Sequence, residues 1–267
     1  MMKKLFLCAA SALLCIICQA QEAEDFNGKY QRLSKAFGPA SVGVESLIER
    51  WEQAEPESKD MYLAKFNFYL AKSHSRTAVP MDKVKYMGKA PVLEIPDSTG
   101  KKIKYFEDEI FVDSLFARAI NSLEKAIGID PLDVSLHYAK ILTYISYEKE
   151  SPDIALSETL KWMENNRKNH PEWVNGNFEE YLQNCCWQFY SIASPKSYEA
   201  FRKVSEQAVK DFPANVNFQN NLGAYWMTAK NNPKKALKYY ESVLKKDPTN
   251  QAAALNIRIA KKKIAAK

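Results

Sequence analysis

Apolar residues recur every three or four positions through most of the chain, and Pro, Gly, Asn or Asp residues separate the segments with this spacing. Such spacing places apolar side chains on one face of an α-helix. The pattern predicts helices over residues 22–37, 41–53, 60–72, 133–149, 152–169, 178–193, 195–211, 216–230, 233–246 and from 250 onward, and one more that Asp113 or Ser114 caps and that runs to 127. The expected fold class is therefore all-α.

One segment breaks the helical pattern. Residues 73–108 hold three prolines and two glycines, which disfavour a helix. Within this segment, residues 92–95 and 103–106 are short β-prone runs on either side of the turn-rich residues 96–100. Two such runs around a turn predict a β-hairpin. Because an isolated hairpin is marginally stable in water, we expect this one to pack on the helices.

The predicted helices contain an internal repeat. At relative positions 0, 4, 7 and 12, the chain holds a small or branched residue, a larger apolar residue, a further apolar residue and a proline. Small residues let two helices approach closely, the larger residue fills the groove between them, and proline ends the helix. The pattern occurs at Ala236, Tyr240, Val243 and Pro248, at Ala119, Leu123, Ala126 and Pro131, and at Val44, Ile48, Trp51 and Pro56.

The segment around residues 214–248 resembles a tetratricopeptide repeat (TPR). Residues 221–226 read Asn-Leu-Gly-Ala-Tyr-Trp and are similar to the Leu-Gly-x-x-Tyr centre of the first TPR helix, and residues 236–248 are similar to the second helix. The resemblance implies a TPR-like α-solenoid of about five helix pairs, with residues 250–267 as a capping helix and the short β-hairpin inserted between the two helices of one pair. The alternative is an irregular helical bundle.

In TPR proteins, the first helix of each pair lines a groove in which partners bind. The resemblance places Asn217, Asn220, Ala224 and Met227 toward this groove, where Asn220 and the adjacent Asn221 can hydrogen-bond an extended peptide. Lys65 and Lys140 occupy equivalent positions in two copies and are further candidates for the groove.

The N-terminus has the anatomy of a secretory signal peptide. Lys3 and Lys4 precede an apolar stretch over residues 5–18, and a small-residue cleavage site ends at Ala20. This predicts a signal peptide over residues 1–20 and a mature chain over 21–267. A transmembrane helix and a lipid anchor on Cys18 are the alternatives. The segment resembles signal peptides of Bacteroidetes-like bacteria, which implies a periplasmic or cell-surface location.

Charge, histidine spacing and cysteine content argue against several classes of function. The 38 basic and 32 acidic residues give a net charge of +6 without a concentrated basic face, which argues against nucleic-acid binding. The three histidines have no partner at metal-ligand spacing, so neither a metal nor another cofactor is expected. Only Cys185 and Cys186 remain after cleavage of the signal peptide. They are either two thiols packed in a helix or a vicinal disulfide.

No hydrolase, metalloprotease or phosphate-binding motif occurs in the sequence. The chain is therefore expected to be a non-catalytic scaffold of the bacterial cell envelope that engages a protein or peptide partner. Two alternatives remain open. The first is a carbohydrate- or small-ligand-binding protein, with the 73–108 insertion as one wall of its site and an exposed tryptophan such as Trp173 or Trp187 as a sugar contact. The second is a thiol-dependent envelope enzyme that uses Cys185 or Cys186.

Overall fold

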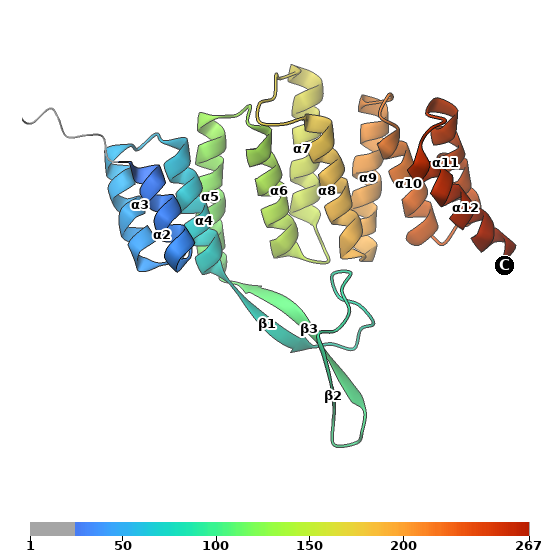
Figure 1. Ribbon diagram of the computed structural model, residues 1–267, viewed down its shortest axis with the longest axis horizontal. Coiled ribbons are helices and arrows are strands. Elements are labelled where there is room, and N and C mark those ends of the chain that lie inside the picture. Colours follow the sequence, from blue (N-terminus) through green and yellow to red (C-terminus); the bar gives the residue numbers. More distant parts are fainter. Residues whose placement is uncertain (1–24, 267) are drawn as a thin grey trace, which may run out of the picture.

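The structure is a computed structural model that describes residues 25–266 (Figure 1). The expected signal peptide and the anchor on Cys18 lie outside these residues. The helices are α2 (Phe26–Phe37), α3 (Val42–Ala54), α4 (Lys59–Ser73), α5 (Asp113–Ile129), α6 (Val134–Glu148), α7 (Asp153–Asn169), α8 (Phe178–Ile192), α9 (Pro195–Asp211), α10 (Val216–Thr228), α11 (Pro233–Lys246) and α12 (Gln251–Ala265).

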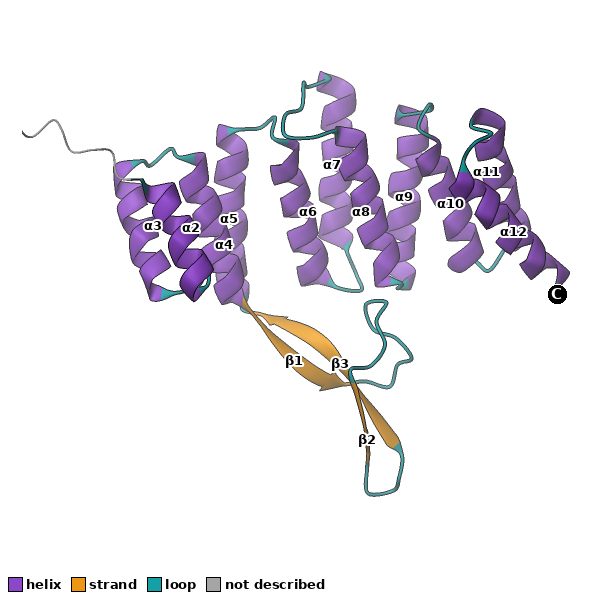
Figure 2. Cartoon of the chain, in the orientation of Figure 1, coloured by secondary structure: helices purple, strands orange, loops and turns teal. Residues whose placement is uncertain are grey.

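These helices stand side by side in one row, and the chain runs along the row from one end to the other (Figures 1 and 2). Successive helices form the pairs α2/α3, α4/α5, α6/α7, α8/α9 and α10/α11, and α12 packs on α11 at the end of the row. We call α2, α4, α6, α8 and α10 the first helices and their partners the second helices. The expected all-α solenoid of about five pairs with a capping helix is confirmed.

The close approach that the repeat predicts is present in the pair α10/α11. A Cβ atom built on Gly223 of α10 would lie 2.3 Å from the ring of Tyr240 in α11, so only glycine fits there. Ala236, Tyr240 and Val243 are all buried, and the ring of Tyr240 occupies the space that the glycine leaves. The apolar residues at the same relative positions in α5 and α3 are also buried, and they include Leu123 and Trp51 of the core. This pattern of small and large residues produces the TPR-like pairing.

The insertion forms three strands rather than two. They are β1 (His74–Pro80), β2 (Leu93–Pro96) and β3 (Lys102–Phe111), in the order β1-β3-β2 with antiparallel neighbours. The hairpin expected from the sequence is the pair β2/β3, in which Ile95 lies opposite Ile103. The additional strand β1 continues directly from α4 and pairs with the part of β3 that leads into α5.

The sheet leaves the row of helices at the ends of α4 and α5 and passes beneath the lower ends of α6 and α8 in the view of Figure 1. The far end of β2 and β3 projects away from the helices (Figure 2), and all four residues of β2 are exposed. The expectation that this hairpin packs on the helices is therefore wrong for its far end. In the described part of the chain, no helix is both long enough and apolar enough to cross a membrane.

Candidate functional site

A tight turn of the insertion reaches the end of α8. Tyr86 and Lys89 exchange two backbone hydrogen bonds of 3.0 and 2.9 Å around Met87 and Gly88, which both have positive φ. Residues 86–89, which we call the docking hairpin, therefore have the backbone of a type I′ turn. A Cβ atom on Gly88 would lie 2.1 Å from the carbonyl oxygen of Ser191 in α8. Glycine thus allows both the turn and the close contact with the helix.

The docking hairpin is held against the sheet by a buried tyrosine. The ring of Tyr86 packs edge-on against Phe106 of β3, and its hydroxyl donates to Asp108 Oδ1 at 2.9 Å. Lys149, just after α6, forms an ion pair with the same carboxylate at 2.8 Å. Burial acts to raise the pKa of Asp108, but the hydrogen bonds from Lys149 and Tyr86 outweigh it and hold the pKa below its usual value. Asp108 therefore stays charged and joins the docking hairpin, β3 and the end of α6.

A second set of contacts joins β3 to α6. The hydroxyl of Ser146 donates to Glu109 at 2.7 Å. Arg76 of β1 lies 3.6 Å from Glu107 and 3.8 Å from Glu109, and Lys89 lies 4.0 Å from Glu107. These ion pairs are weak individually because the Arg76 side chain is 71% exposed. Together they balance the acidic side chains of β3 with cations.

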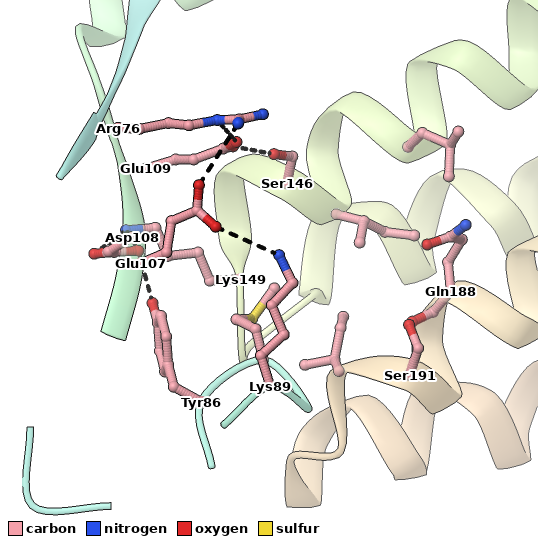
Figure 3. A pocket seen from close by; sticks show the side chains of 14 residues that line it. Arg76, Tyr86, Lys89, Glu107, Asp108, Glu109, Ser146, Lys149, Gln188 and Ser191 are labelled. Atoms are coloured by element: carbon pink, nitrogen blue, oxygen red, sulfur yellow. Dashed lines mark hydrogen bonds and ion pairs between the residues drawn. The ribbon is translucent and has the colours of Figure 1, made fainter. Parts of the chain in front are cut away.

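These contacts surround a cavity of about 430 Å³ between the insertion and the solenoid, which we call the junction cavity (Figure 3). The helical residues that line it belong to α6 and α8, which are both first helices. Its apolar wall comes from Met87, Leu142, Ile145 and Ile192, and Gln188 provides a polar amide. The volume is within the range of small-ligand and peptide-anchor sites, and the lining combines apolar contacts with a few polar groups.

An exposed tryptophan lies one turn of α8 from a residue that lines this cavity. Trp187 of α8 is 60% exposed, and its ring lies 6.1 Å from that of Tyr190. Ser191, which lines the cavity, follows Trp187 by four residues, so both lie on the same side of α8. The tryptophan is not part of the lining of the cavity, but it offers an exposed aromatic surface on the same first helix.

The three asparagines expected in the groove have different environments in α10. Asn217 is exposed at the start of the helix. Asn220 accepts a hydrogen bond of 3.3 Å from Asn256 of α12. Asn221 is 9% exposed and exchanges two hydrogen bonds of 3.1 and 3.0 Å with Gln183 of α8. Asn221 therefore connects two first helices, and the role of all three in binding remains a prediction.

The two lysines expected in the groove pair with carboxylates of second helices. Lys65 lies 2.6 Å from Glu52 of α3. Lys140 lies 3.0 Å from Glu124 of α5 and 2.8 Å from Glu158 of α7. The structure thus places both ammonium groups against second helices, and it does not bring them together with the asparagines. Their role in binding also remains a prediction.

The residues of the junction cavity were not expected from the sequence. Their only signal was the acidic triplet Glu107-Asp108-Glu109 within a β-prone run, because three consecutive acids are unusual in a strand unless cations face them. The cations come from β1, the docking hairpin and the end of α6, which are far apart in the sequence.

Cys185 and Cys186 are both free thiols buried in α8. Burial raises the pKa of Cys185 well above its usual value and that of Cys186 to about 12, although hydrogen bonds from Ser205 and Asn221 act to lower the latter. Such thiols stay protonated and are poor nucleophiles. Among residues 25–266, no group of three or more His, Cys, Asp or Glu side chains is arranged to hold a metal ion.

No protein-family model matches the sequence, and no curated protein matches it. Among solved structures, the chain is similar to YrrB, described as a TPR protein with an unusual peptide-binding site, with 13% identity over 91% of this chain and 95% of YrrB and a TM-score of 0.40. It is similar to MamA from Desulfovibrio magneticus RS-1, with 12% identity over 85% of this chain and 98% of that chain and a TM-score of 0.40. It is also similar to the P58(IPK) TPR domain, with 7% identity over 90% of this chain and 65% of that chain and a TM-score of 0.32. At these identities, the likeness concerns the fold alone.

Proposed function

We propose that this protein is a non-catalytic scaffold that binds a protein or peptide partner beside the first helices α6 and α8, with the β-insertion as one wall of the binding site. The observation that carries the proposal is the junction cavity, in which an insertion from one helix pair closes over the first helices of two later pairs. The exposed Trp187, one turn of α8 from the cavity residue Ser191, supports this function, because tryptophan is enriched among the residues that dominate binding energy at protein interfaces.

The chemistry of the site favours binding over catalysis. Its charged groups are paired with each other, and Asp108 is held in its charged form by Lys149 and Tyr86. The two thiols lie in the core of α8 with raised pKa values, which argues against the alternative of a thiol-dependent enzyme.

The experiment is a selection of peptides from a random 12-residue library with the chain from residue 21 to 267, followed by titration of a selected peptide. We expect Trp187→Ala to weaken its binding about tenfold or more, as for a dominant interface residue. The matched control is Ile154→Ala, because Ile154 is an exposed apolar residue on the second helix α7. If the library yields no peptide that binds, or if the two variants bind a selected peptide equally well, the proposal is wrong.

The alternative of a carbohydrate or another small ligand makes a different prediction. The volume of the junction cavity also suits such a ligand. In that case, a panel of oligosaccharides and metabolites should raise the melting temperature of the wild type and not that of Trp187→Ala, while no library peptide binds.

We also propose that the protein is located in the cell envelope, on the basis of residues 1–20 of the sequence. Fractionation of the native host should recover the chain in the periplasm or at the surface. Mass spectrometry should find Gln21 as its first residue. A cytoplasmic chain that retains residues 1–20 would refute this location.

A further inference from the structure

The pairing of β3 is unequal on its two sides. Strand β1 pairs with β3 from Tyr105 to Phe111, whereas β2 pairs with it only from Lys102 to Tyr105. Beyond Tyr105, no strand within residues 25–266 pairs with β3 on the side opposite β1. We call this stretch, residues 106–111 on the side opposite β1, the open edge of β3.

The register shows which backbone groups face the open edge. Met81 N–H donates to the carbonyl of Lys104 at 3.0 Å, and Val112 N–H donates to that of Ser73 at 2.7 Å. Since an antiparallel ladder bonds alternate residues, the even-numbered residues of β3 bond to β1. Val92 N–H donates to the carbonyl of Tyr105 at 2.8 Å, which places the odd-numbered residues on the other side. The backbone groups of Glu107 and Glu109 therefore point to the open edge.

This edge borders the junction cavity. Glu107, Asp108 and Glu109 line one wall of the cavity, and α6 and α8 line the opposite wall (Figure 3). An added strand needs about 4.8 Å between its backbone and that of its neighbour. The cavity adjoins Glu107, so a strand that is added there in the direction of β2 would enter it. The N–H of Glu109 also donates to the carboxylate of Asp108 and helps to lower the pKa of that group. The N–H of Glu107 points away from β1 in the register of the ladder.

The outer edge of β1 is a poorer site for an added strand. The backbone of Pro80 falls at an outward-facing position of the ladder, where the ring leaves no N–H to donate. Proline and exposed charges are devices that protect strand edges from pairing. The open edge of β3 holds no proline over residues 106–111, and the solenoid shields it instead.

The lining of the cavity indicates what kind of segment fits. Three cations and three acids surround it, so their formal charges cancel, and they already pair with each other. Met87, Ile145 and Ile192 offer apolar contact. A short extended segment with uncharged, partly apolar side chains suits this lining, because it brings no unpaired charge into the cavity.

We propose that the partner contributes an extended peptide segment that enters the junction cavity and pairs as an added strand with the open edge of β3, through the backbone N–H and carbonyl of Glu107 and the carbonyl of Glu109. This inference rests on the proposed function, since it names the way in which the partner binds. The backbone hydrogen bonds supply affinity, and the apolar wall selects the side chains.

The test uses a peptide selected from the 12-residue library and a series of versions that are N-methylated at one position each. An added strand bonds to β3 through every second residue. We therefore expect a period of two, in which methylation at alternate positions weakens binding about tenfold and methylation at the positions between them changes it less than about twofold. Equal effects at neighbouring positions would overturn the proposal.

A matched pair of variants tests the same hydrogen bonds from the protein side. Both Glu107→Ala and Glu107→Pro remove the carboxylate, but only the proline removes the N–H that faces the cavity. Because this N–H does not bond to β1, we expect β3 to tolerate the proline, and circular dichroism checks this. We expect the proline variant to bind the peptide about tenfold more weakly than the alanine variant. If the folded variants bind equally and methylation shows no period of two, while Trp187→Ala still weakens binding, the added strand is wrong and the scaffold function stands.

Discussion

Alanine in place of Gly88 tests whether the docking hairpin contacts α8. Gly88 has φ +74°, a conformation that costs an L-residue about 1–2 kcal/mol. The new Cβ atom would lie 2.1 Å from the carbonyl oxygen of Ser191, whereas carbon–oxygen contacts settle near about 3.3 Å. The hairpin and the helix must therefore separate by roughly 1 Å, because the backbone at the end of α8 is fixed by its own hydrogen bonds.

Gly100 provides the matched control. It has φ +84° in the turn between β2 and β3, and an added Cβ atom there meets nothing within 4 Å. Gly100→Ala therefore carries the backbone strain without the clash. Separation at Gly88 also weakens the hydrogen bond between Tyr86 and Asp108, which contributes about 0.5–1.5 kcal/mol. We expect Gly88→Ala to lose about 1–3 kcal/mol more than Gly100→Ala, which is the usual cost of overpacking.

Two measurements check this difference. At about 2–4 °C per kcal/mol for a chain of this size, the melting temperature of Gly88→Ala should lie roughly 2–12 °C below that of Gly100→Ala. Hydrogen exchange should become faster in the peptides that cover residues 81–92 in Gly88→Ala alone. Equal melting temperatures together with unchanged exchange in this segment would refute the docked position of the hairpin.

Three further predictions concern the solenoid. Urea unfolding should show that Gly223→Ala destabilises the protein by about 1–2 kcal/mol, because the new methyl group meets the buried ring of Tyr240. Gly128→Ala should stabilise it by about 0.5–1 kcal/mol, because the methyl group there meets no other atom within 4 Å. Burial acts to raise the pKa of Glu158, but its contacts with Lys140 outweigh burial and lower the pKa. The charged carboxylate therefore stabilises the fold above its unfolded pKa of about 4.3. This stabilisation is lost as the pH falls through the lower pKa of the folded state. At neutral pH, Lys140→Met should have a lower free energy of unfolding than the wild type. In urea titrations, this difference should shrink below about pH 4. Cys186 should resist a thiol reagent at pH 8 in the native protein and react after unfolding, since its pKa is raised to about 12.

The sequence predicted the helices well because their ends carry local signals. The predicted ranges 195–211 and 233–246 are the observed bounds of α9 and α11. In both helices, a proline is the first residue. The Ser or Asn cap just before it accepts a hydrogen bond from the backbone N–H three residues after the cap. These signals depend on neighbouring residues alone, so they can be read without knowledge of the tertiary structure.

Strand β1 and the junction cavity depend on contacts between distant residues. Residues 74–80 show no alternation of apolar and polar side chains, and they form a strand because β3 pairs with them. The cavity combines β3 with a turn, α6 and α8, and no periodicity within one segment reveals how the insertion packs on the helices. The sequence also does not reveal where the side chains of Lys65 and Lys140 point, because they pair with carboxylates on second helices that are distant in the sequence.

The contact between Gly88 and Ser191 joins the second helix pair to the fourth across the third. In a repeat array, each unit ordinarily contacts only its immediate neighbours, so the ends can unravel while the rest stays folded. A packing contact that skips one unit closes a ring of contacts within the array. The three pairs inside this ring should then unfold as one cooperative block, whereas α2/α3 and α10–α12 remain free to fray. The insertion would also fix the twist between the second and fourth pairs, and with it the shape of the surface offered to a partner.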